Sequence, residues 1–207
     1  VTLNTGIDAL SQAMEGMVAR NSSALGDVLA LDTIRLVKQW LPRAVADGHD
    51  LEARAQMLFA AMLSGCVIAQ SGTTLVHGMG YLFTTGFGVA HGLANGFLLT
   101  PVFQFNAWHA PAKVAAMADA LGFPAEPTPA DAAAKIGAAV HALFKELGVS
   151  AAAKDAGVDG NRLDWCTEKV WSNRGRFANQ IGEPSRDDVA RMYRQAWEGA
   201  AYQPERN

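Results

Sequence analysis

The residues of this chain that could do chemistry together are one carboxylate and two imidazoles, Asp8, His77 and His91, with Gln12 beside the carboxylate. Asp8 and Gln12 are four positions apart in a segment of helical periodicity, so their side chains share one face of a helix. Oxygen and nitrogen ligands of this kind, brought to one point, suit Zn²⁺ or Fe²⁺. If His91 lies in the first turn of a helix, the helix dipole favours the neutral, metal-binding imidazole.

Each of these residues also has an ordinary structural interpretation. A single buried histidine is usually a hydrogen-bonded core residue, and Asp8 could cap or charge the start of a helix. Gln12 is more often structural than a ligand. The remaining histidines have no partner pattern, and we expect structural roles for His49, His109 and His141. Spacing alone therefore leaves both a metal site and these structural roles open.

Both candidate histidines lie in a long segment without charged side chains. Residues 55–112 contain no Asp, Glu, Lys or Arg, although these make up 18% of the chain. Because unpaired charges are costly to desolvate, we expect this segment to be buried on most sides. Its longest nearly apolar run, Met57 to Ala69, falls short of the roughly 20 residues that cross a bilayer, so we predict no membrane insertion.

Helical patterns dominate the rest of the chain. Apolar residues recur at three- and four-residue steps, and typical capping residues mark several helix starts. The expected helices include 7–18, 28–37, 129–147 and 185–197, with Gly148 ending the third, and with Gly86–Gly88 connecting helices that end near Leu82 and begin near Val89. Val102–Phe105 is the one short strand candidate. We predict an all-α, bundle-like fold of about seven to nine helices.

Composition narrows the classes of partner and compartment. A net charge of −3 and a pI of about 5.9 give no basic stripe for nucleic acid. The two cysteines, Cys66 and Cys166, offer neither a disulfide framework nor a Cys-x-x-Cys pair. Residues 1–20 carry acidic side chains and lack the pattern of a secretory signal. We expect a cytoplasmic protein that binds neither nucleic acid nor membrane.

Four segments carry a resemblance to a known family. Asn4–Gly16 resembles the Asp-Ala-Leu-x-His-Ala-x-Glu segment of iron-containing (group III) alcohol dehydrogenases, and Leu75–Met79 resembles their Leu-Val-His-Gly-Met segment. Gly88–Pro101 is similar to their His-Gly-x-Ala-Asn segment and the Leu-Leu-Pro that follows it. Ser185–Trp197 resembles their final helix, so the agreement covers nearly the whole chain.

The resemblance implies a fold and an activity. It makes residues 1–207 a single helical metal- and substrate-binding domain of the dehydroquinate synthase-like fold, without the NAD(P)-binding domain that precedes it in the family. It implies a divalent metal, Fe²⁺ first and Zn²⁺ as the alternative, at Asp8, Gln12, His77 and His91. With NAD(P) held by the other domain, the intact enzyme interconverts an alcohol with an aldehyde or ketone whose oxygen the metal polarises, and this chain alone is inactive. The expected partners are the small alcohol or aldehyde, the nucleotide-binding domain, which would dock on an exposed apolar face, and further copies in a homo-oligomer.

The chain departs from the family pattern at three places. Gln12 replaces a histidine, and its neutral amide oxygen is a weaker donor; related glycerol dehydrogenases use one Asp and two His, which leaves a workable open site. Tyr81 replaces a second histidine, and we favour core filling over a proton relay for its phenol. Asn179–Gln180 stands where the family shows Asn-Pro.

These departures keep other functions open. The first is a metal-free, non-catalytic helical interaction module derived from the same fold. Within the family, a maleylacetate-reductase-like or glycerol-dehydrogenase-like reductase is the alternative. A self-contained metallohydrolase with Glu15 as base has little support, because the chain contains no His-Glu-x-x-His pair.

Overall fold

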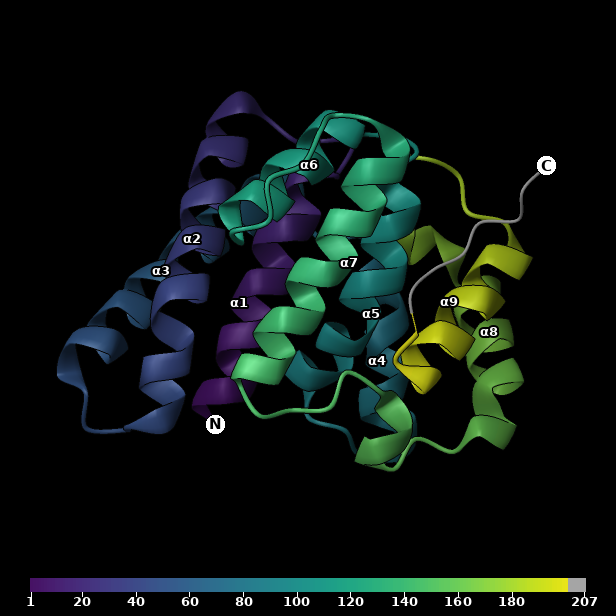
Figure 1. The fold of residues 1–207 in the computed structure, drawn as a ribbon. Helices are drawn as coiled ribbons and strands as arrows, with labels where there is room; N and C mark the ends of the chain where they lie inside the picture. The colour runs from purple at the N-terminus through teal and green to yellow at the C-terminus, as the bar shows by residue number, and fades with distance from the viewer. Residues whose placement is uncertain (201–207) are drawn as a thin grey trace.

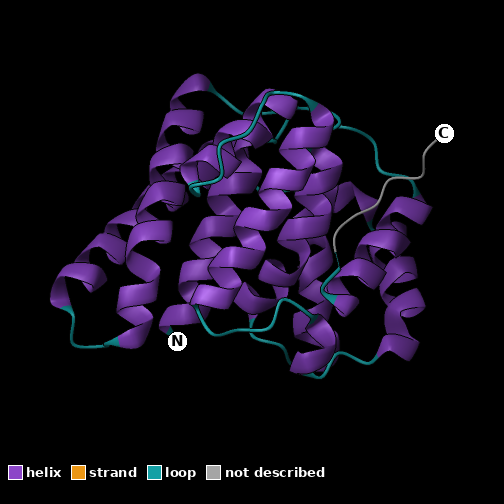
Figure 2. Cartoon of the chain, in the orientation of Figure 1, coloured by secondary structure: helices purple, strands orange, loops and turns teal. Residues whose placement is uncertain are grey.

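The computed structural model describes residues 1–200, apart from the side chain of residue 176, and helices follow one another along this part of the chain (Figure 1). The α-helices are α1 (Thr2–Met17), α2 (Ala24–Ala46), α3 (Leu51–Ser71), α4 (Leu75–Phe87), α5 (His91–Asn106), α6 (Pro111–Ala120), α7 (Pro129–Glu146), α8 (Leu163–Ser172) and α9 (Arg186–Glu198), with short 3₁₀ helices η1 (Ala153–Ala156), η2 (Gly160–Arg162) and η3 (Arg174–Phe177). Within residues 1–200 there is no named strand, and the extended pairing is one isolated bridge between Ala19 and Gln180 (Figure 2). The all-α prediction is confirmed.

α1 and α5 lie in the middle of the molecule and contact most of the other helices. α1 packs against α2, α3 and α5, and α5 also contacts α4, α7 and α9. In Figure 1, α2 and α3 lie along one flank, α8 and α9 lie along the other, and α1, α5 and α7 lie between them. Apolar side chains from all of these helices form one continuous core. The candidate ligands come from the middle of α1 and from the first turns of α4 and α5, where these three helices meet.

Local capping fixes several helix boundaries where the sequence predicts them. The Thr128 side chain accepts a hydrogen bond from the Asp131 amide, and Ser185 and Asp188 form a reciprocal capping box at the start of α9. Such caps contribute about 1 kcal/mol each. Gly148 has a positive φ of 68° just after α7, a conformation that glycine adopts without a steric penalty.

The structure corrects two local predictions. Val102–Phe105 is not a strand but part of α5, in which every residue except His91 and Leu93 is buried. A helix buried all round shows no polar face, so a short piece of it can alternate like a strand. The helix expected to end near Leu82 continues to Phe87, and its C-cap is Gly88 in the left-handed region. The connection to α5 therefore consists of residues 88–90.

The uncharged segment is only partly buried. α4 and α5 have the expected buried cores, whereas α3 exposes the apolar side chains of Leu58, Phe59 and Met62. By length and apolar composition alone, α3 could cross a membrane, and the core helices of many proteins meet the same two conditions. One third (33%) of its most apolar 18-residue stretch is buried inside the molecule. The sequence shows the absence of charge, and it does not show which apolar face remains outside.

Candidate metal centre

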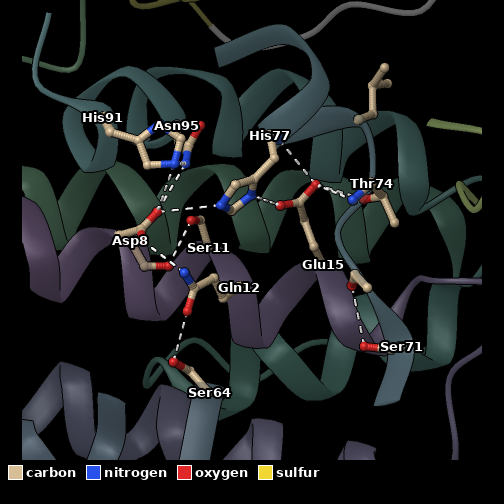
Figure 3. Close-up of polar contacts among 12 residues, drawn as sticks. Asp8, Ser11, Gln12, Glu15, Ser64, Ser71, Thr74, His77, His91 and Asn95 are labelled. Carbon is tan, nitrogen blue, oxygen red and sulfur yellow. Dashed lines mark hydrogen bonds and ion pairs between the residues drawn. The ribbon is translucent and has the colours of Figure 1, made fainter. Parts of the chain in front are cut away.

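Three helices bring the predicted carboxylate and both predicted imidazoles to one point (Figure 3). Asp8 comes from the middle of α1, His77 from the first turn of α4, and His91 from the first residue of α5. The Nε2 atoms of His77 and His91 lie 3.4 Å and 3.6 Å from the same oxygen, Oδ1 of Asp8. One ligand atom from each residue lies within 4.8 Å of the other two. This spacing suits a single cation among them.

A close approach between α1 and α5 makes this convergence possible. A Cβ added at Gly92, next to His91, would lie 1.8 Å from the backbone oxygen of Asn4 and 3.2 Å from the Cβ of Asp8. Any side chain at this position would push the first turn of α5 away from α1. The glycine after His91 is therefore part of the site geometry.

Gln12 supports Asp8 and does not face the point where the ligands meet. Its Nε2 donates to Oδ2 of Asp8 at 2.8 Å, and its Oε1 accepts from the Ser64 hydroxyl at 3.0 Å (Figure 3). An ionised carboxylate only accepts hydrogen bonds, so the amide nitrogen must face Asp8. The amide oxygen, which is the only ligand atom that Gln12 could offer, then points towards α3.

Asn95 is a further polar residue of the site, outside the set predicted from the sequence. Its Nδ2 donates to Oδ1 of Asp8 at 3.0 Å and lies 3.2 Å from Nε2 of His91. Asn95 is buried and comes four residues after His91 on α5, so it lies one turn further along the same face. That spacing is the signal that could have identified it.

Glu15 is a second residue that supports a candidate ligand and lies outside the set predicted from the sequence. Its side chain is fully buried, and its Oε2 contacts Nδ1 of His77, on the side of the ring opposite to Asp8 (Figure 3). Asp8, Gln12 and Glu15 follow one another at steps of four and three residues, so all three lie on one face of α1. The sequence alone suggests Glu15 only as a base for hydrolysis, whereas this spacing is the signal that could have identified it.

The charges at the site favour a positive group. Burial by itself raises the pKa of Asp8, but hydrogen bonds to His77 and Asn95 and the charges of the two imidazoles lower it below the usual 3.8. Burial likewise lowers the pKa of His77, but the charge of Glu15 and hydrogen bonds to Asp8 and Glu15 raise it to about 10. Two carboxylates thus act on one imidazole, and their charge would balance a divalent cation bound among neutral histidines.

Tyr81 is not core filler. It is 48% exposed, and its ring lies edge-on to His91 with 6.1 Å between the ring centroids. Tyr81 therefore lies on the open side of the site.

Gln180, which stands in place of the family's proline, accepts from the Leu75 amide at 3.3 Å and donates to Oδ1 of Asn106. These contacts tie the start of α4 to the end of α5. Gln180 therefore supports the two helices that carry His77 and His91.

Comparison with known proteins identifies the family of this chain. The family described as Fe-containing alcohol dehydrogenase family, C-terminal, matches residues 2–197. The chain belongs to the iron-containing alcohol dehydrogenase family. The 1,3-propanediol dehydrogenase of Klebsiella pneumoniae is 30% identical over 198 residues, which are 95% of this chain and 51% of that protein. The chain thus spans about half the length of the curated relatives that match 95% of it.

Solved structures agree with this assignment. An iron-containing alcohol dehydrogenase from Thermotoga maritima is 32% identical and has a TM-score of 0.78, with 96% of this chain and 49% of that chain covered. Sulfoacetaldehyde reductase from Bifidobacterium kashiwanohense, solved in complex with NAD⁺, is 28% identical with a TM-score of 0.79, over 95% of this chain and 50% of the other. The chain therefore has the fold of the C-terminal part of these enzymes. Its relatives are oxidoreductases of the alcohol dehydrogenase type.

Proposed function

We propose that this chain is the metal- and substrate-binding half of an NAD(P)-dependent alcohol dehydrogenase, with Asp8, His77 and His91 as the metal ligands. The observation that carries the proposal is the position of their ligand atoms, all within 4.8 Å of one another and drawn from three helices. A carboxylate and two imidazoles suit Fe²⁺, with Zn²⁺ as the alternative. When bound, such an ion acts as a Lewis acid on the oxygen of an alcohol, aldehyde or ketone.

The residues of the chain hold the ligands in place and leave one side open. Gln12 and Asn95 donate to the two oxygens of Asp8, so its carboxylate is held from both sides. The His91 side chain is 37% exposed and Tyr81 lies beside it, whereas the His77 side chain is 14% exposed. Substrate therefore approaches from the side of His91 and Tyr81.

The nicotinamide cofactor belongs to a second domain in this proposal. Support comes from the half-length match to the relatives and from the NAD⁺ in the structure of the related sulfoacetaldehyde reductase. Residues 1–207 then act as a single domain that is inactive alone. Its partners are the nucleotide-binding domain and a small alcohol or carbonyl substrate, and exposed apolar side chains such as Leu58, Phe59 and Met62 offer surface for domain contacts.

A metal titration tests the proposal. The purified chain, first stripped with chelator, is titrated with Zn²⁺ and, without oxygen, with Fe²⁺, and one bound ion per chain is expected. His77→Ala should abolish binding and leave the helical circular dichroism largely unchanged. His141→Ala is the matched control, because His141 lies on α7 outside the ligand group. Stoichiometric metal in His77→Ala, or its loss in His141→Ala, would contradict the ligand assignment.

One observation favours a second function, a metal-free interaction module of the same fold. Gln12 replaces a family ligand, and its amide oxygen faces Ser64. The same titration separates the two functions, because the interaction module binds no ion with either metal.

A further inference from the structure

Glu15 is a buried charged group that the ligand set does not use. It is fully buried between α1 and the start of α4. A buried carboxylate is costly unless its oxygens accept hydrogen bonds, and here both oxygens have partners. Oε1 accepts from the Thr74 amide at 2.9 Å, the Thr74 hydroxyl at 2.8 Å and the His77 amide at 3.2 Å, while Oε2 contacts Nδ1 of His77.

The contacts of Oε1 fix the backbone around His77. Thr74 is the N-cap of α4, and its own side chain makes no capping hydrogen bond. The amides at the start of a helix have no partner within the helix, and the helix dipole there favours negative charge. Glu15 accepts from two of these amides, those of Thr74 and His77. A carboxylate from α1 thus caps α4 in the turn that carries His77.

The contact of Oε2 fixes the ring of His77. Because an ionised carboxylate only accepts hydrogen bonds, Nδ1 must carry the hydrogen that it donates to Glu15. The other ring nitrogen, Nε2, faces Oδ1 of Asp8 at 3.4 Å. In the neutral imidazole with hydrogen on Nδ1, the lone pair is on Nε2, on the side where the three ligands meet.

We propose that Glu15 is a positioning residue for the metal centre, which holds His77 by backbone and ring and selects the tautomer that presents Nε2. The inference rests on the proposed metal-binding function. Carboxylates that accept the second N–H of a ligating histidine orient the ring and make it a stronger ligand. A single side chain of α1 does this here and also caps the helix that supplies the histidine.

Glu15→Gln tests the proposal with little change in shape. A glutamine amide nitrogen facing Nδ1 would force the hydrogen onto Nε2, and an amide oxygen facing Nδ1 would turn the amide nitrogen towards three hydrogen-bond donors. Both orientations conflict with the observed partners. We expect the dissociation constants for Zn²⁺ and Co²⁺ to rise about 10- to 100-fold, measured by competition with a chromophoric chelator. The visible spectrum of the Co²⁺ form should also change.

Thr74→Val is the matched control. It removes one hydrogen bond to the same carboxylate and leaves the contact between Oε2 and Nδ1 in place. It should lower the unfolding midpoint and leave both dissociation constants unchanged. Equal weakening in Thr74→Val and Glu15→Gln would mean that Glu15 acts only through the stability of α4, and wild-type affinity in Glu15→Gln would equally overturn the proposal.

The tautomer of His77 can also be measured on the wild-type chain, so this test does not depend on whether a variant folds. In the Zn²⁺-loaded protein, ¹⁵N NMR of the His77 ring should show a protonated Nδ1 and a metal-bound Nε2. A metal-bound Nδ1 would overturn the role of Glu15 while keeping the metal site. A chain that binds no metal at all would overturn the proposed function, and with it this inference.

Discussion

The contact between α1 and α5 at Gly92 gives the sharpest test of how the site is built. In Gly92→Ala, one methyl group would lie 1.8 Å from the backbone oxygen of Asn4. Because that oxygen belongs to a packed helix, it cannot rotate away as a flexible side chain could. The two atoms must separate by roughly 1.5 Å or more before the contact becomes an ordinary one. His91 moves with α5, and Asp8 stays with α1.

The size of the effect follows from two opposing contributions. Overpacking of this kind costs about 1–3 kcal/mol, while alanine gains up to about 1 kcal/mol over glycine in helix propensity. Because a contact of 1.8 Å with backbone is a severe case, we take the upper end of that cost, and about 3 minus about 1 leaves a net loss of about 2 kcal/mol. That loss lowers the Tm by roughly 4–8 °C in a domain of this size. Displacing one of three ligands should also weaken Zn²⁺ binding by about 10-fold or more.

Gly65→Ala is the matched control for this experiment. Gly65 lies inside α3, and nothing lies within 4 Å of an added Cβ. The same substitution should therefore stabilise the chain by about 0.5–1 kcal/mol, because alanine has the better helix propensity. Thermal unfolding and a Zn²⁺ competition assay on both variants provide the measurements. The reasoning is refuted if Gly92→Ala has the stability and the metal affinity of the wild type.

Three further predictions concern a ligand, the thiols and a buried hydroxyl. Gln12→His should tighten Zn²⁺ binding by about 100-fold in a competition assay. The free energy of Zn²⁺ binding to a site with four ligands is about 10–16 kcal/mol, which is about 3 kcal/mol for each ligand. Unchanged affinity would exclude position 12 from the ligand sphere. A thiol reagent should label exposed Cys66 in the native chain and Cys166 only after unfolding, because burial raises the pKa of the Cys166 thiol to about 12; labelling of both thiols without denaturant would contradict this. Tyr193→Phe removes a buried hydrogen bond of 2.9 Å to the Met79 carbonyl and should lower the unfolding free energy by about 1 kcal/mol in denaturant titration, and full stability would mean that this bond contributes nothing.

Much of the fold could be predicted from local signals. Thr128 and Ser185 begin helices where their side chains can accept from amides three residues on, and Gly148 ends one where a left-handed residue is needed. These signals depend on a few neighbouring residues, so a sequence contains them in full. The exposed face of α3 does not follow from such signals, because Leu58 and Phe59 have the composition of core residues and only their neighbours in space decide their burial.

The candidate site could be predicted only in part for a related reason. Asp8, His77 and His91 belong to segments that the family resemblance identifies, and the structure brings them together. Glu15 and Asn95 act through contacts with those residues, and their partners come from other helices. A step of four or seven residues shows that two side chains share a helix face, but it does not show which helix packs on that face.

The face of α1 explains how the site can keep its geometry without the family's first histidine. Asp8 is a candidate ligand, Gln12 donates to it, and Glu15 holds the ring of His77. The amide at position 12 offers no ligand atom at the centre but donates to Oδ2 of Asp8, which leaves Oδ1 directed at both imidazoles. Because this hydrogen bond supports Asp8, we expect Gln12 to lower metal affinity and to leave the arrangement of the three candidate ligands unchanged.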